Sequence, residues 1–134
     1  NFNIDSISVG VTDNPEYSRM TITTYGDEKQ VEQIVKQLDK MIDVLEVKHL
    51  DEHKTVYREL SIFKIKLSNA NDSMEVNKLA NAYGGKIHDV RKDSIMVELT
   101  ATPDQIRAFE ELAKPFGILE VARTGVAALQ RSGA

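Results

Sequence analysis

Two histidines separated by a short acidic stretch are the first residues that suggest chemistry in this chain. His49 and His53 lie four positions apart, with Asp51 and Glu52 between them. On a helix, that spacing places both imidazoles on one face, where they could bind a divalent metal ion. However, residues 44–50 alternate between apolar and polar types and predict a strand, so the charged residues that follow indicate a solvated linker. We therefore expect no metal site here.

Two further motifs resemble catalytic or phosphate-binding elements. His88 and Asp89 are adjacent, but neighbours on a strand point to opposite faces and cannot form a base with its orienting carboxylate. Gly84 and Gly85 precede a lysine, as in a phosphate-binding loop, but they lie between a predicted helix and a strand, which is the wrong order. An ordinary hairpin and a helix stop are the expected structures.

One polar pair leaves two interpretations open. Arg19 follows Ser18 at the start of a predicted strand, where its guanidinium could bind a carboxylate or form an ion pair within the chain. The sequence contains no cysteine, which excludes disulfides, thiolate nucleophiles and cysteine-ligated zinc. No set of residues combines into a catalytic site, so we expect a binding or regulatory protein without catalytic residues and without a metal.

Composition restricts the class of partner. The chain has 134 residues, 41% of them hydrophobic, and a net charge of −4, which together indicate a globular protein without the basic surface that binds nucleic acid or acidic membranes. No apolar run approaches the roughly 20 residues needed to span a bilayer. We expect a cytoplasmic protein that binds neither nucleic acid nor membrane.

Hydrophobic periodicity divides the chain into two parts on either side of a charged linker at 51–54. The first part reads strand, strand, helix, strand, with the elements at 2–9, 19–25, 28–41 and 44–50. Asp27 and Gln30 fit a capping box for the helix. The second part reads strand, helix, strand, strand, helix, strand, at 57–67, 72–83, 86–91, 94–101, 102–114 and 117–123.

The two parts are copies of one unit. At an offset of 75 the predicted core positions coincide: Met20 with Ile95, Ile22 with Val97, Thr24 with Leu99, Val31 with Ile106 and Ile34 with Phe109. At an offset of 74, the letters Leu-Glu-Val recur unchanged at 45–47 and 119–121. A duplicated strand and helix pattern of this kind predicts an α+β protein with two tandem ferredoxin-like (βαββαβ) domains.

The first copy begins at its hairpin, whereas the second has a strand and a helix before its hairpin. We therefore expect domains at 1–52 and 56–134, the first lacking its first strand and helix in this chain. By the same template, about 25 residues with a strand and a helix are expected ahead of Asn1. In this topology the first strand lies inside the sheet, so the remaining strands of the first copy would pair incompletely without it.

Several stretches resemble a known family. They are Asn3 to Val9, Thr12 to Ile22, Gly26 to Lys29, Gln33 to Lys40, Asp43 to Val47, Arg58 with Glu59, and Glu120 to Gly125 with Leu129 and Arg131. In these stretches the chain resembles the small regulatory subunit of acetolactate synthase, also called acetohydroxyacid synthase. The likeness covers essentially the whole chain and is most specific at 12–22 and 120–125.

The resemblance implies an N-terminal ACT domain followed by a C-terminal ferredoxin-like domain. Members of this family are non-catalytic subunits in the biosynthesis of valine, isoleucine and leucine. They activate a large catalytic subunit and confer feedback inhibition by valine or a related amino acid. The resemblance further implies homodimers paired through the ACT domains. No cofactor is expected in this subunit; thiamine diphosphate, Mg and FAD are expected on the catalytic partner.

The resemblance also implies an effector site built from two pieces. One is a loop of the type Glu-Asn-x-Pro-Gly-Ala-Leu-Ser-Arg, to which this sequence has no match. The other is an Asn-Ile pair at the start of a strand, matched here by Asn3 and Ile4. Two other functions stay open: a free-standing amino-acid-sensing ACT protein that regulates another enzyme or a transcription system, and, less favoured, a small enzyme that depends on one of its histidines.

Overall fold

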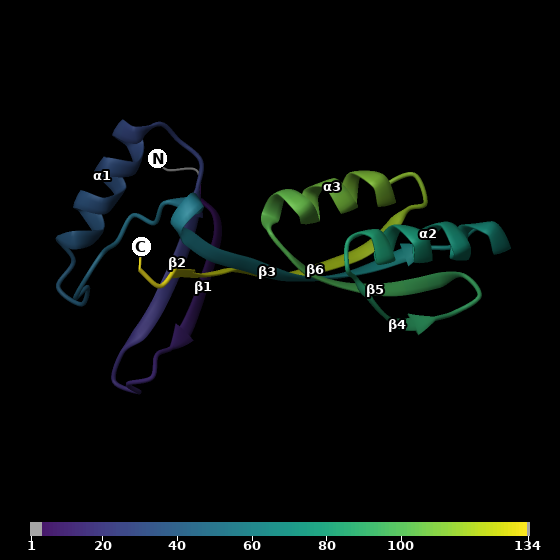
Figure 1. Ribbon diagram of the computed structural model, residues 1–134, viewed down its shortest axis with the longest axis horizontal. Coiled ribbons are helices and arrows are strands. Elements are labelled where there is room, and N and C mark those ends of the chain that lie inside the picture. The colour runs from purple at the N-terminus through teal and green to yellow at the C-terminus, as the bar shows by residue number, and fades with distance from the viewer. Residues whose placement is uncertain (1–3, 134) are drawn as a thin grey trace. The chain divides into compact units, whose positions relative to one another are not determined.

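The computed structural model describes residues 4–133, and two compact units divide the chain (Figure 1). One comprises Asn1–Tyr57 with Val126–Ala134, and the other comprises Arg58–Gly125. In chain order the elements are β1 (Ile4–Val11), β2 (Ser18–Thr24), α1 (Glu28–Asp39), the 3-10 helix η1 (Glu52–Lys54), β3 (Thr55–Lys66), α2 (Ala70–Ala82), β4 (Lys86–Val90), β5 (Ser94–Ala101), α3 (Pro103–Ala113) and β6 (Ile118–Gln130). The α+β fold class is as predicted, and the domain boundaries at 1–52 and 56–134 stay a prediction.

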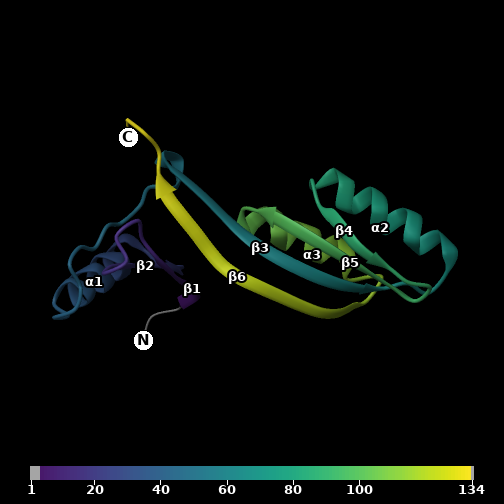
Figure 2. The same ribbon diagram turned by 90° about the horizontal axis from the view of Figure 1, so that it is seen from below.

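The second unit has the predicted arrangement of the repeat. Its strands follow the order β4-β5-β3-β6, so the two strands that flank each helix in the chain are not consecutive in the sheet. β5 is antiparallel to both β3 and β4. Helices α2 and α3 lie together on one face of this sheet, and the other face carries no helix (Figures 1 and 2).

A closed apolar core lies between the helices and the sheet of the second unit. Alternate residues of β3 and β5 point into it, including Phe63, Ile65, Ile95, Val97 and Leu99, and all five are fully buried. From α3, Phe109 stacks at a tilt on Phe63, with the ring centroids 5.1 Å apart, and meets the edge of Tyr83 at 5.7 Å. Aromatic pairs in this geometry add to the stabilisation from burial alone.

The first unit contains the antiparallel hairpin of β1 and β2, followed by α1. The capping box predicted for α1 is present: Asp27 accepts a hydrogen bond from the backbone N–H of Gln30, whose side chain accepts one from the backbone of Asp27. On the polar face of the hairpin, the hydroxyls of Ser6 and Thr23 are hydrogen-bonded. The Ser8 hydroxyl donates to the backbone oxygen of Val126 at 2.7 Å, which ties the hairpin to the end of β6.

Three differences from the predicted elements have a visible cause in the structure. The strand expected at 44–50 is wrong: these residues form no regular secondary structure, and the linker that follows forms η1. In the predicted topology this strand would pair with the first strand of its copy, and no described strand takes that place. An unpartnered strand leaves its backbone hydrogen-bonding groups without a ladder, so propensity alone does not maintain it.

The other two differences concern element ends. Helix α2 begins at Ala70 with Asn69 as its cap, rather than at the predicted Asp72, whose carboxylate instead accepts from the backbone N–H of Ser68. β6 extends to Gln130, seven residues beyond the predicted end at 123. The backbone N–H of Arg131 donates to the carbonyl of Lys54 at 2.7 Å, so pairing with a distant segment accounts for the extra length.

Candidate functional site

The hairpin of the first unit places its apolar residues on one face. Ile7 lies opposite Ile22, and Val9 lies opposite Met20. Directly opposed residues of an antiparallel pair share a face, so these four side chains lie together. A register shift between Ile4 and Ser6 brings Ile4, opposite Thr24, to the same side. One face of the hairpin is therefore apolar along its length, and the other face carries serines and threonines.

This apolar face is open, in contrast to the equivalent face of the second unit. Met20 and Val9 are 58% and 62% exposed, whereas Ile95, the repeat equivalent of Met20, is fully buried. Among the described residues, all buried apolar side chains except Val126 lie at positions 63–113. Exposed apolar patches of this kind on a folded unit mark surfaces that meet another structure.

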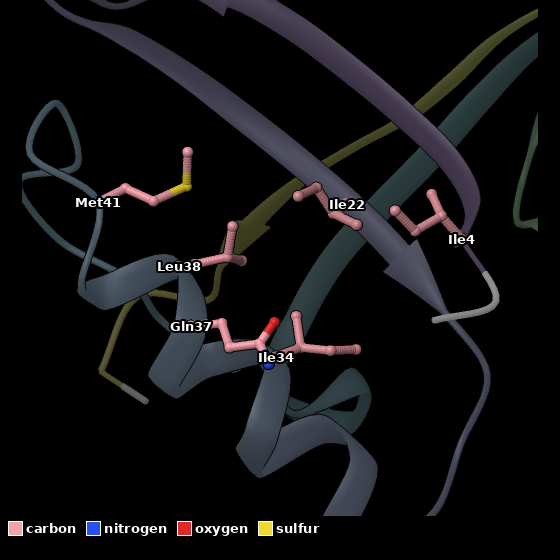
Figure 3. Close-up of a pocket in the computed structure, with 6 residues that line it drawn as sticks. All are labelled: Ile4, Ile22, Ile34, Gln37, Leu38 and Met41. Carbon is pink, nitrogen blue, oxygen red and sulfur yellow. The ribbon is translucent and has the colours of Figure 1, made fainter. Parts of the chain in front are cut away.

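A groove of about 290 Å³ lies between α1 and the hairpin (Figure 3). Its lining is apolar except for one amide, and consists of Ile4, Ile22, Ile34, Gln37, Leu38 and Met41. Figure 3 shows side chains from α1 and from the hairpin pointing toward one another across this space. A groove of this size and chemistry can take a small branched apolar group, and Gln37 offers a hydrogen-bond donor and acceptor beside it.

Of the two predicted effector residues, only Ile4 can be placed relative to this groove. Asn3 lies outside the described residues. Ile4 is the first residue of β1, half exposed, and lines the groove. The sequence did not indicate Gln37 as a site residue, because a polar residue on an amphipathic helix ordinarily reads as part of the solvated face.

The other candidate motifs take up structural roles. His88 Nε2 lies 2.6 Å from Glu98 Oε1 on the neighbouring strand, and Asp89 pairs with Arg91, so His88 and Asp89 have separate partners. Gly84 has a φ of +69° and ends α2, as predicted. Arg19 lies on the polar face of the hairpin opposite Gly10, and both interpretations of this arginine stay predictions.

Neither a metal cluster nor a membrane-crossing helix is found in the described part of the chain. Residues 4–133 contain no group of three or more histidine, cysteine, aspartate or glutamate side chains that could hold a metal ion. Within the same residues, no helix is both long enough and apolar enough to cross a bilayer. The candidate binding features of the first unit are therefore its open apolar face and the groove.

Two family models match successive parts of the chain. Residues 1–46 match a family described as the AHAS small subunit-like ACT domain. Residues 58–132 match a family described as the small subunit of acetolactate synthase.

Individual relatives match along almost the whole chain. A probable acetolactate synthase small subunit from Methanothermobacter thermautotrophicus is 43% identical over 130 residues, covering 97% of this chain and 77% of the relative. The acetolactate synthase small subunit of Bacillus subtilis is 40% identical over 131 residues, covering 97% and 76%. The crystal structure of a small subunit from Thermotoga maritima matches with a TM-score of 0.86 and 34% identity, covering all of this chain and 83% of that one.

Proposed function

The chain belongs to the family of acetolactate synthase small subunits, and from that premise we propose that it is a non-catalytic regulatory subunit in branched-chain amino acid biosynthesis. In this proposal it acts in the cytoplasm, binds the large catalytic subunit and raises its activity. The observation that carries the proposal is that both halves of the chain match, in order, the two family segments of a small subunit. Thiamine diphosphate, Mg and FAD belong to the large subunit in this proposal.

We further propose that valine or a related amino acid is the effector and that Asn3 and Ile4 form part of its site. Valine offers an ammonium, a carboxylate and a small apolar side chain. The amide of Asn3 can both donate and accept hydrogen bonds, and Ile4, with the apolar lining next to it, can contact the side chain. Inhibition requires that valine bind the inhibited state of the complex more tightly, by about 1–3 kcal/mol of coupling.

The glycine-containing loop that forms the other half of the family's effector site has no match in this sequence. Such a loop supplies backbone donors to the carboxylate at a helix N-terminus. We therefore expect weak valine binding by these 134 residues alone, and calorimetry that shows strong saturable binding would contradict the two-piece site.

Homodimerisation through the first unit is also part of the proposal. Its hairpin has an open apolar face, and β1 and β2 have only each other as strand neighbours among the described residues. Strands without a second neighbour present unpaired backbone groups that another copy can extend.

Co-purification tests the proposed function. A tagged form of this chain is expected to retain the large subunit of acetolactate synthase from the same organism at a fixed stoichiometry. A tagged chain with Phe109→Asp, which places a charge in the core of the second unit, serves as the unfolded control. Retention of a different enzyme or of a transcription factor, with no large subunit, would instead favour a free-standing amino-acid sensor.

A further inference from the structure

The outer edge of β6 in the second unit is exposed and apolar. β6 lies at the end of the four-stranded sheet, with β3 as its one strand neighbour in the described part of the chain (Figure 2). Leu119 and Val121 are 51% and 42% exposed and lie on the same side of the strand, because side chains alternate. Two of the charges on this stretch are held within the unit: Glu120 by Lys64, and Arg123 by Glu110.

The opposite edge of the same sheet is built differently. β4 has only five residues, and it carries Lys86, His88 and Asp89. Its pairing with β5 is interrupted by a register shift between Ile87 and Asp89. Short length, charge and a bulge are the devices by which edge strands avoid pairing with other chains. Residues 118–124 of β6 have no such interruption and no proline, so the two edges of this sheet differ in their readiness to accept another strand.

The direction of the backbone groups of β6 follows from its contacts with β3. The backbone N–H of Lys66 donates to the carbonyl of Gly117 at 2.7 Å, so even-numbered residues of β3 direct their backbone groups toward β6. Lys64 pairs with Glu120, and the backbone N–H of Leu60 donates to the Thr124 hydroxyl, so even-numbered residues of the two strands lie opposite each other. Glu120 and Ala122 therefore direct their backbone groups toward β3, and Leu119, Val121 and Arg123 direct theirs away from it.

We propose that residues 118–124 of β6 pair with the same residues of a second copy of this chain, antiparallel, about a two-fold axis at Val121. A two-fold pairing centred there places Val121 opposite its own copy and Glu120 opposite Ala122, and the outward-directed backbone groups of Leu119, Val121 and Arg123 bond their counterparts in the second copy. Leu119 then lies opposite Arg123, whose aliphatic stem can cover it. No like charges are directly opposed in this register, whereas centring on Glu120 would oppose two carboxylates.

The proposed edge is separate from the dimer contact proposed for the first unit, and it extends the proposed function by a second self-association surface. An antiparallel pair across the two-fold axis would join two four-stranded sheets into one continuous sheet. It would also reduce the exposure of the valine and leucine of each copy, because each gains a cross-strand neighbour.

Cysteine cross-linking tests this pairing directly, because the chain has no cysteine of its own. In the proposed register the two Val121 residues form a hydrogen-bonded pair with Cα atoms about 5.5 Å apart, within the range that a disulfide spans. Val121→Cys is expected to form a covalent dimer on mild oxidation. Val90→Cys, at a somewhat more exposed valine on β4, is the matched control and is expected to cross-link at least tenfold more slowly.

Equal cross-linking rates for the two cysteine variants would overturn the proposal. A second measurement does not depend on the disulfide: sedimentation of the Val121→Lys chain is expected to show self-association weakened at least tenfold, and the Val90→Lys chain is expected to associate like the unmodified protein. Circular dichroism of all four variants checks that the fold is retained. Unchanged self-association of folded Val121→Lys would likewise overturn the pairing.

Discussion

Gly85 shows how a single position can join a helix to a sheet. It follows the cap of α2, and its N–H donates to the carbonyl of Ala80 at 2.7 Å. A Cβ atom at this position would lie 3.1 Å from a methyl group of Val97 and 3.2 Å from the carbonyl oxygens of Ala80 and Glu98. Two of these neighbours are backbone atoms, which cannot move without displacing the helix or the strand.

The two adjacent glycines therefore respond differently to alanine. Gly85→Ala is expected to lower the free energy of unfolding by about 1–3 kcal/mol, as overpacking does. A Cβ atom at Gly84 would meet open space, but the φ of this residue is +69°. Gly84→Ala is therefore expected to lower the free energy of unfolding by about 1 kcal/mol through backbone strain alone. Urea denaturation of both variants measures the difference. A Gly85→Ala chain as stable as the unmodified protein would show that the close approach is absent.

The Lys64–Glu120 ion pair gives the second unit a defined response to pH. The hydrogen bond from Lys64, 2.7 Å long, and then its charge lower the pKa of Glu120; the same hydrogen bond and the charge of Glu120 raise the pKa of Lys64. A carboxylate with a lowered pKa stabilises the fold above its ordinary pKa of 4.5, and this stabilisation is lost as the pH falls through the folded-state value.

The Glu120→Gln variant is therefore expected to lose less stability than the unmodified chain as the pH falls below 4.5. The stability of the unmodified chain relative to this variant should be greatest at neutral pH and should shrink below pH 4.5. The effect is small because both side chains are exposed to solvent and screened. Asp104→Asn, in a helix-surface pair with Arg107, is the control for removing one carboxylate. If the stability difference between the unmodified chain and Glu120→Gln grew as the pH fell, it would contradict the lowered pKa of Glu120.

At the scale of elements, features set by residues close together in the sequence were predictable, and features set by distant residues were not. The capping box of α1 was predictable, because Asp27 and Gln30 lie three residues apart. The cap of α2 was misplaced because Asn69 and Asp72 are both suitable residues, and the Ser68 contact decides between them. The length of β6 depends on a hydrogen bond to Lys54, which lies far away in the sequence. Residues 44–50 form no strand, because no described strand pairs with them. Local periodicity reports neither of these distant contacts.

The candidate site was partly predictable for the same reason. Ile4 was named only through the family motif, and its role in effector binding stays a prediction, whereas the apolar alternation of the hairpin was visible directly. The openness of that face was not visible, because equivalent repeat positions are buried in the second copy and half-buried or exposed in the first. Gln37 becomes a groove residue only through the packing of α1 against the hairpin.

This difference between the two copies predicts unequal local stability. The second unit has a closed core, whereas β1, β2 and α1 contain no fully buried side chain. Backbone amides of β1, β2 and α1 are therefore expected to exchange hydrogen through low-energy local openings, and amides of β3, β5 and α3 only through larger ones. Native-state hydrogen exchange measures this. Equal protection of α1 and α3 would contradict it.

At the scale of the whole molecule, the chain is expected to act through an assembly rather than through chemistry of its own. The open face of the first unit, the apolar edge of β6 and the match to small subunits along both halves all concern binding. In this proposal the open apolar surface is a contact surface.

Reconstitution is the most direct test of this account. Acetolactate formation by the purified large subunit would be measured alone and with increasing amounts of this chain. The rate is predicted to rise and to saturate near equal numbers of the two subunits, while the chain alone produces no acetolactate. A rate unchanged by an excess of folded chain, or acetolactate formation by the chain alone, would contradict the proposal that this is a regulatory subunit.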